Sequence, residues 1–280
     1  MTAKSVYRPR QSALETLFNR NKVIIGVIHS KPLPGSPEYE GEPMEDLIDY
    51  AVEEGRRYAA GGVDALICEN HGDIPFLRPN DIGQETAAAM AVMADRVRRE
   101  TGLTLGINVL GNGALTAIAI AKAAGASFVR VNQWTNAYVA NEGFVEGDAA
   151  KATRYRSWLR AKDVKVFADV HVKHGAHAIV ADRSIPELTR DAEFFDADVV
   201  IATGQRTGNA ATSEEIKTIK ESTHLPVCVG SGVNIENIGD ILSVADGVII
   251  ASSLKRDGVW WNEVDLDRVS MFMKEIRNVR

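Results

Sequence analysis

A repeated pattern constrains the fold of this chain more than any single motif. Short apolar, β-branched runs alternate with longer stretches whose apolar residues recur with a period near 3.6, as in amphipathic helices. Strands and helices that alternate in this way form parallel sheets with right-handed crossovers. Eight such units without a long interruption predict an α/β fold consisting of a single (β/α)8 TIM barrel. The predicted strands are Val23–His29, Ala65–Asn70, Thr104–Val109, Ser127–Asn132, Val164–Val172, Asp198–Ala202, Val227–Gly230 and Gly247–Ala251.

The joints and the chain ends fit one domain. Glycine in Ala-Ala-Gly-Gly-Val-Asp before the second strand, and in Ala-Ala-Gly-Ala before the fourth, suits a left-handed helix C-cap. We expect residues 1–280 to form a single domain with an N-terminal extension over about residues 1–20, and a helix around Ser12–Phe18 to cover the bottom of the barrel. An open, doubly wound sheet is disfavoured because no Gly-x-Gly-x-x-Gly motif follows the first strand. No nicotinamide or flavin cofactor is expected.

Composition limits the classes of partner. The formal net charge is -6 and the pI about 5.6, and no run of Lys or Arg stands out, so no nucleic acid is expected as a partner. No apolar stretch approaches the ~20 residues of a bilayer span, so no integral membrane segment is expected. Cys68 and Cys228 lie inside apolar runs and are interpreted as buried thiols, which favours a cytoplasmic location. Whether the chain forms a homo-oligomer stays open.

The last two predicted strands end at small residues that suit a phosphate group. Glycine lets the backbone approach an anion closely, and free N–H groups with the following helix N-terminus supply partial positive charge. Barrels commonly hold phosphate after their seventh and eighth strands. The expected partner is therefore a phosphorylated small-molecule substrate. The predicted phosphate-binding residues are Gly230, Ser231, Gly232, Val233, Ser252 and Ser253.

Polar residues cluster where the other strands are predicted to end, which is where barrels carry out chemistry. Side chains alternate along a strand, so Asp169, His171 and Lys173 should share the face that lines the barrel mouth. Asp169 is the predicted central general acid or base, and His171 or Glu69 is its counterpart. Lys173 is predicted as an electrophile or a Schiff-base amine. The predicted substrate-binding residues are His29, Asn70, Asn108, Arg130, Asn132, Thr203 and Gly204.

A structural interpretation of the same residues competes with the catalytic one. Asp169 could form a buried ion pair with Arg130 or Lys173, which would make this layer part of the fold rather than of the site. Metal binding also stays open. A divalent ion held by Glu69, Asp169 and His171 is geometrically possible, although no dedicated ligand motif is present.

Three loops complete the prediction. His29 opens the proline-rich loop Ser30–Gly41, which is interpreted as a lid over a ligand. The loop Trp134–Gly147 offers polar side chains for sugar hydroxyls or a base. The pair Trp260-Trp261 is interpreted as packing.

The motif from Val27 to Pro37 resembles the signature of the BtpA/SgcQ family, in which an apolar strand is followed by His and then by Leu-Pro-Gly-Ser-Pro. The resemblance continues in Glu69-Asn70, Ile107–Leu110, Val129–Asn132, Ala168–His174 and Gly230–Gly232. It implies a ribulose-phosphate-binding-type barrel. Family members are associated with photosystem I accumulation or with sugar metabolism, and some are called nucleoside triphosphatases. This chain has no Walker-type Gly-Lys-Ser/Thr loop, so a phosphate-cradle mechanism of nucleoside triphosphate hydrolysis finds no support.

Two functions remain after these observations. The first is an enzyme that acts on a phosphorylated sugar or nucleotide-like molecule by isomerisation, epimerisation, lyase chemistry or glycosidic cleavage. The alternative, which the resemblance alone motivates, is a non-enzymatic assembly or stability factor for a photosynthetic membrane complex. A polar rim has no evident use in a scaffold, which favours the enzyme.

Overall fold

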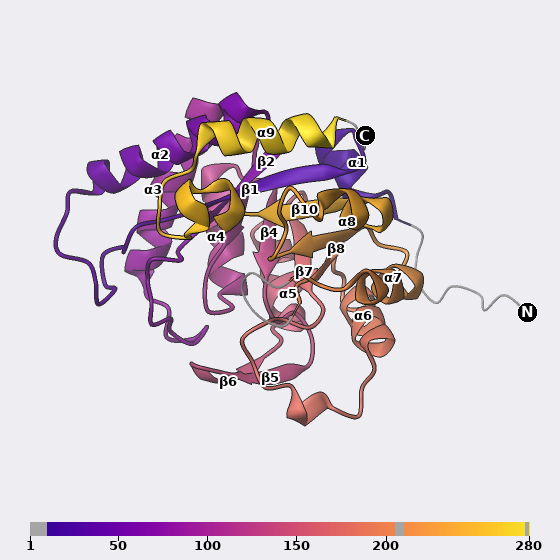
Figure 1. Cartoon of the computed structure of the whole chain (residues 1–280). Coiled ribbons are helices and arrows are strands. Elements are labelled where there is room, and N and C mark those ends of the chain that lie inside the picture. Colours follow the sequence, from indigo (N-terminus) through magenta and orange to yellow (C-terminus); the bar gives the residue numbers. More distant parts are fainter. Residues whose placement is uncertain (1–9, 205–209, 278–279) are drawn as a thin grey trace, which may run out of the picture.

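The computed structural model describes residues 10–204, 210–277 and 280, and its centre is a closed barrel of parallel strands (Figure 1). The order around the barrel is β1-β10-β9-β8-β7-β4-β3-β2, so each strand pairs with two others. The predicted TIM barrel is confirmed. Its strands are β1 (Val23–His29), β2 (Ala65–Glu69), β3 (Thr104–Asn108), β4 (Phe128–Val131), β7 (Lys165–Asp169), β8 (Val199–Ala202), β9 (Val227–Gly230) and β10 (Gly247–Ile250).

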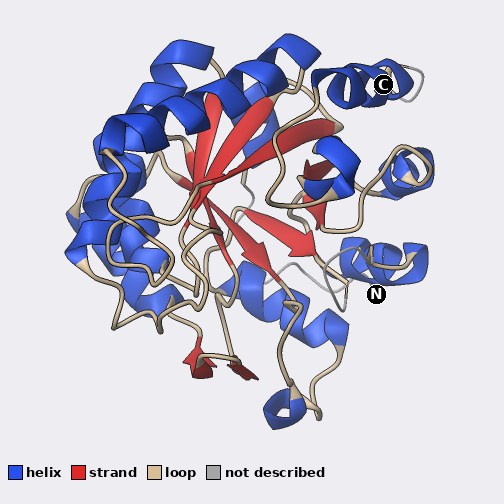
Figure 2. Cartoon of the chain, turned by 60° about the vertical axis from the view of Figure 1, so that its left-hand side comes forward, coloured by secondary structure: helices blue, strands red, loops and turns tan. Residues whose placement is uncertain are grey.

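Helices surround the strands on the outside of the barrel (Figure 2). The predicted glycine joints are confirmed, since Gly62 (φ 92°) and Gly125 (φ 70°) end their helices in the left-handed conformation that other residues adopt only under strain. No described helix combines the length and the hydropathy that crossing a membrane requires. The outer helices are α2 (Met44–Gly61), α3 (Gln84–Thr101), α4 (Ala114–Ala124), α5 (Ala149–Trp158), α6 (Ile185–Phe194), α7 (Ser213–Ser222), α8 (Ile238–Val244) and α9 (Leu266–Ile276).

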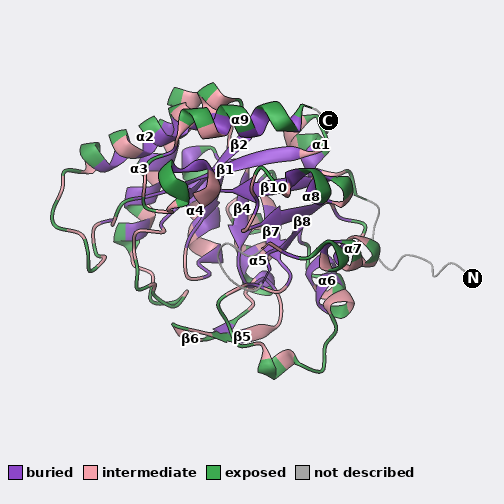
Figure 3. Ribbon diagram, in the orientation of Figure 1, coloured by how far each residue is buried: buried purple, intermediate pink, exposed green. Residues whose placement is uncertain are grey.

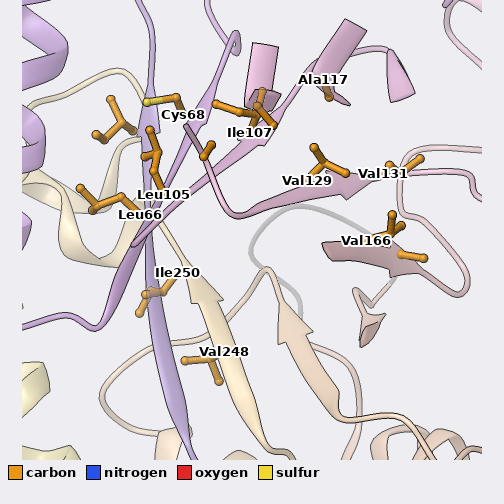
Figure 4. Packing of buried hydrophobic residues seen from close by; sticks show 14 of the residues in the cluster. Leu66, Cys68, Leu105, Ile107, Ala117, Val129, Val131, Val166, Val248 and Ile250 are labelled. Carbon is orange, nitrogen blue, oxygen red and sulfur yellow. The ribbon is translucent and has the colours of Figure 1, made fainter. Parts of the chain in front are cut away.

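The strands separate two apolar layers, because successive side chains point to opposite faces. Figure 3 shows the strands as buried and the surrounding helices as partly exposed. Outward side chains such as Ile107 and Val129 pack under the helices, and Cys68 lies among them (Figure 4). Inward side chains fill the barrel. Phe128 and Phe167 stack there with ring centroids 4.5 Å apart. The two cysteines of the chain are buried free thiols, as predicted.

The bottom of the barrel is closed by the predicted N-terminal helix. Helix α1 (Ala13–Phe18) places Leu14 in the inner apolar layer, and the Phe18 ring meets Phe128 edge-on at 6.2 Å. Ser12 caps this helix by accepting a hydrogen bond from the Glu15 N–H. Residues 1–9 of the expected extension lie outside the described residues.

The structure corrects the predicted fifth strand. Strand β7 ends at Asp169, not Val172, because the chain turns away from the barrel: Val172 packs on Tyr138 and Val145. These two residues belong to an unpredicted antiparallel hairpin, β5 (Ala137–Ala140) and β6 (Gly143–Glu146), within the loop after β4. The alternation that was expected to bring His171 beside Asp169 is therefore wrong, whereas Lys173 still reaches the barrel mouth.

Candidate functional site

The register of the barrel builds a row of polar side chains at the C-terminal ends of the strands. His29 of β1 is paired with Glu69 of β2, Glu69 with Asn108 of β3, and Asn108 with Arg130 of β4. All four residues are buried. Because parallel strands in register present their ends at one edge, residues far apart in the sequence become neighbours around the barrel mouth. The predicted gathering of polar strand ends is observed for these four.

Arg130 and Asp169 form a buried, two-point ion pair. The Arg130 Nε and Nη2 atoms donate to the two Asp169 carboxylate oxygens, each at 3.2 Å. Asn132 and Thr203 donate to the same carboxylate at 3.1 and 2.5 Å. Burial lowers the pKa of Arg130, but the carboxylates of Asp169 and Glu69 more than offset this and raise it above its ordinary value. Asp169 thus holds Arg130 charged and fixed.

The same contacts limit what Asp169 can do directly. Its side chain is 0% exposed and accepts four hydrogen bonds, whereas Arg130 lines both cavities described below. Neither cavity has Asp169 among its lining residues in the described part of the chain. This geometry favours the alternative of a buried ion pair between Asp169 and Arg130, which also holds Arg130 in position. Thr203 was expected to bind substrate, but its hydroxyl donates its hydrogen bond to Asp169.

The loops after β9 and β10 lie against each other and present free donors. Ser231 and Gly232 have φ values of 78° and 68°, and the Ser253 hydroxyl donates to the Val233 carbonyl at 2.7 Å. In the described residues, the N–H groups of Gly232, Val233, Ser252 and Ser253 donate to no protein acceptor. Successive N–H groups in such a concave loop form an anion-binding site.

A cavity of about 320 Å³ joins these loops to the polar row. Its walls include Ser231–Val233 and Ser252-Ser253 on one side, and His29, Glu69 and Arg130 on the other. The Lys173 amine reaches into it and donates to the Ser231 hydroxyl at 3.2 Å. Burial and the charge of Arg130 lower the pKa of Lys173 to about 8, against the opposing effect of nearby carboxylates.

A second cavity, of about 370 Å³, adjoins the first. The two share Glu69, His71, Arg130 and Lys173, so these residues stand at their junction. The rest of the second cavity is more apolar, with Phe76 and Val172 in its walls, and Asn108 and Asn132 also line it. The hairpin contributes Tyr138 and Ala140, so the loop after β4, which was expected to offer polar side chains to a ligand, lines this cavity.

Three ligand-type side chains converge at the junction. His29 Nε2 lies 3.6 Å and His71 Nδ1 lies 3.5 Å from Glu69 Oε1. Burial lowers the pKa of His29 to about 3 and also lowers the pKa of His71, while Glu69 opposes both shifts. Burial raises the pKa of Glu69, but the two histidines and Arg130 bring it below its ordinary value. Neutral imidazoles beside an ionised carboxylate are the form in which these groups bind metal ions.

The metal set considered from the sequence is not assembled. Glu69 is present, but Asp169 has its oxygens occupied by Arg130, Asn132 and Thr203. His171 stacks on His177 with ring centroids 3.8 Å apart, and burial with His177 lowers its pKa to about 4. The two cavities do not have His171 among their described lining residues. Strand β7 ends at Asp169, two residues before His171, so the barrel does not carry His171 into these cavities.

Other predicted binding residues have structural partners. Asn70 accepts from the Leu110 N–H at 2.7 Å and donates to Asp73, so it ties two loops together. Gly204 has φ 71° and is the last described residue before a gap. Sequence reasoning missed His71, which lies in the loop after β2, where alternation no longer assigns a side chain to a face. Trp260 packs as interpreted, with its ring centroid 4.4 Å from that of His71, and its carbonyl also pairs with His29 Nδ1 at 3.1 Å.

Comparisons with known proteins agree with this architecture. The model of the BtpA family matches residues 20–278. An uncharacterized protein of Archaeoglobus fulgidus is 45% identical over 253 residues, which cover 90% of this chain and 98% of that protein. The photosystem I biogenesis protein BtpA of Synechocystis sp. is 38% identical over 258 residues, which cover 92% and 88%.

Solved structures with the same barrel are more distant. (S)-3-O-geranylgeranylglyceryl phosphate synthase from Thermoplasma acidophilum, in complex with sn-glycerol-1-phosphate, has a TM-score of 0.60 at 15% identity, covering 96% of this chain and 100% of that one. Thiamine phosphate pyrophosphorylase from Pyrococcus furiosus has a TM-score of 0.57 at 17% identity, covering 94% and 98%. These likenesses establish the fold, and the sequence matches establish the family. The chain belongs to the BtpA family.

Proposed function

We propose that this protein is an enzyme that acts on a phosphorylated sugar or nucleotide-like small molecule at the C-terminal rim of its barrel. The first cavity supports this most directly, because it combines unpaired backbone N–H groups after β9 and β10 with ionisable side chains from the other strands. Backbone donors that face a cavity favour a bound anion. Ionisable side chains beside it could then act on the rest of the bound molecule.

The substrate would span both cavities. Its phosphate would accept hydrogen bonds from Gly232, Val233, Ser252 and Ser253, and the Lys173 amine beside Ser231 would add positive charge. Its body would extend past the junction into the second, more apolar cavity. In this arrangement the first cavity would hold the phosphate group, and the second cavity would recognise the rest of the substrate.

Glu69 and Lys173 are the best candidates for proton transfer. Both stand at the junction, Glu69 has its pKa below its ordinary value and Lys173 has a pKa of about 8. A carboxylate base and an amine acid near neutral pH suit isomerisation, epimerisation, lyase chemistry or glycosidic cleavage. Arg130, held by Asp169, would stabilise negative charge that develops on the substrate. An imine at Lys173 is a minor branch, which borohydride trapping with carbonyl substrates would detect as a stable Lys173 adduct.

The fold neighbours support the phosphate part of this proposal. The synthase was solved with sn-glycerol-1-phosphate, and the pyrophosphorylase is named for thiamine phosphate. Their identities to this chain are low, so neither reaction is carried over.

The test compares phosphorylated ligands with their dephosphorylated partners. Calorimetric binding of a panel of sugar phosphates and nucleoside monophosphates should give at least one ligand whose affinity falls more than about tenfold on loss of the phosphate, because charge-assisted hydrogen bonds each contribute about 1.5–3 kcal/mol. Gly232→Val should remove this preference. Gly62→Val is the matched control, since Gly62 also has positive φ and no atom lies within 4 Å of an added Cβ. Wild-type protein that binds both forms equally would refute the phosphate site.

A second candidate function rests on the name of the Synechocystis relative, photosystem I biogenesis protein BtpA. A scaffold needs no ionisable rim, so the variant Glu69→Gln separates the two candidates. If this variant supports photosystem I accumulation as well as the wild type does in cells lacking their own relative, the assembly role gains. If it fails while it remains folded and abundant, the enzyme is favoured.

A further inference from the structure

We propose that His29, Glu69 and His71 bind one divalent transition-metal ion, of the zinc class, at the junction of the two cavities. One ligand atom from each residue lies within 4.8 Å of the others. The two nitrogen-to-oxygen distances, 3.6 and 3.5 Å, fit ligands of one ion. Two ligand atoms about 2.1 Å from a tetrahedral ion stand about 3.4 Å apart.

The orientation of His29 is the first independent sign of a cation. Its Nδ1 faces the Trp260 carbonyl at 3.1 Å, and a carbonyl oxygen only accepts, so Nδ1 carries the hydrogen. The other nitrogen of the ring, Nε2, then faces a Glu69 oxygen 3.6 Å away, a distance too long for a hydrogen bond. The two atoms therefore face each other at the separation that two ligands of one ion have. A carbonyl that fixes the tautomer of a metal-binding histidine is the usual outer partner.

The orientation of Glu69 and His71 is the second sign. Glu69 Oε2 accepts from the Asn108 amide at 2.5 Å, which leaves Oε1 directed to the two histidines. In the described residues, the buried Nδ1 of His71 has no hydrogen-bond partner. Buried polar atoms without a partner are rare and call for an unseen ligand. A bound ion would satisfy this nitrogen.

The donor set indicates the kind of ion. Two imidazoles and one carboxylate suit zinc, cobalt or iron(II), whereas magnesium and calcium prefer oxygen ligands only. Three protein ligands leave at least one coordination position open, as in catalytic rather than structural zinc sites. The ligands line the cavity, so the open position would face the bound molecule. There the ion could polarise an oxygen of the bound molecule or activate a water molecule. With the ion bound, Glu69 would act as a metal ligand, and the activated water would take the place of Glu69 as the base.

The test uses the metal alone, so it is independent of the phosphorylated substrate. Untagged protein is stripped with a chelator and titrated calorimetrically with zinc chloride and with magnesium chloride. We expect one zinc site per chain, no comparable magnesium binding, and a Co²⁺ visible spectrum typical of four- or five-fold coordination. Stoichiometric zinc binding that survives in Glu69→Gln/His71→Gln would overturn the site, and so would the absence of zinc binding by the wild type.

Graded variants separate ligands from bystanders. Loss of an outer partner typically weakens a site 10–100-fold, so Asn108→Ala should fall in this range and His71→Gln should exceed about 100-fold. The control is His224→Gln, because this side chain is 67% exposed and far along the chain from the proposed ligands. If His71→Gln does not fold, X-ray absorption of the zinc-loaded wild type decides. Two imidazole nitrogens in the first shell support the site, and sulfur or a single imidazole contradicts it.

Discussion

The buried pair of Arg130 and Asp169 yields a prediction that separates positioning from direct catalysis. Asp169→Asn keeps the size of the side chain but removes the charge that Arg130 faces. The Arg130 guanidinium donates to both oxygens of the Asp169 carboxylate, but the amide of the variant has only one acceptor oxygen. One Arg130 donor is therefore left without a partner, and the guanidinium stays buried. Breaking a buried pair in this way costs about 3–5 kcal/mol, because the remaining charge is left without a partner.

This cost corresponds to a measurable change in melting temperature. An unfolding entropy of about 2.1 cal/mol/K per residue gives about 0.6 kcal/mol/K for a chain of 280 residues. The melting temperature should therefore fall by about 5–8 °C, as ~3–5 kcal/mol divided by this entropy requires. Affinity for a phosphorylated ligand should also fall, because Arg130 lines the cavity and would lose its fixed position.

Differential scanning calorimetry and a binding titration on the same samples check both effects. Asp163→Asn is the control, because Asp163 is exposed, and it should leave both values unchanged. An unchanged melting temperature combined with lost turnover would refute the positioning role. That result would return Asp169 to the direct acid–base role expected from the sequence.

Three further predictions follow from other contacts. The Lys173 amine has a pKa of about 8, so it is protonated below that pH and neutral, hence reactive, above it. Its acetylation rate, measured by peptide mass spectrometry, should therefore rise with pH around a midpoint near 8. A midpoint near 10 would contradict this. Lys255→Met should cost about 3 kcal/mol in urea denaturation, because Glu54, 0% exposed, loses its buried cation at 3.0 Å and keeps only partly exposed Arg57 and the Val264 N–H; a loss below about 1 kcal/mol would be inconsistent. Gly106→Val should destabilise by about 1–3 kcal/mol or more, since an added Cβ would lie 2.3 Å from the Phe128 ring; a melting temperature equal to that of the wild type would show that the ring can move.

The barrel could be predicted from the sequence because its signals are local. The periodicity of apolar residues and the left-handed glycines at Gly62 and Gly125 depend on neighbours along the chain. The polar row was also predictable, because once the strands are located, the barrel brings all of their C-terminal ends to one edge. The β5–β6 hairpin could not be predicted, because each of its strands has only four residues and so shows too little alternation to be recognised in the sequence.

The roles within the site depended on contacts between distant residues. Asp169 and Arg130 were both identified, but only the structure shows four hydrogen bonds on the carboxylate. His171 was assigned to the rim by extending alternation past the end of its strand, where the turn toward Tyr138 breaks the period. His71 was missed because the loop that carries it has no period at all.

The hairpin lines one cavity and the phosphate loops line the other, so the two parts of the site could diverge independently among relatives. It contributes Tyr138 and Ala140 to the second cavity, and none of its described residues lines the first. The phosphate loops, by contrast, follow β9 and β10 of the barrel itself. Relatives could therefore exchange or reshape this hairpin and accept a different molecular body without disturbing the phosphate loops. A chimaera that carries the hairpin of another family member would be a direct way to test whether this segment sets specificity.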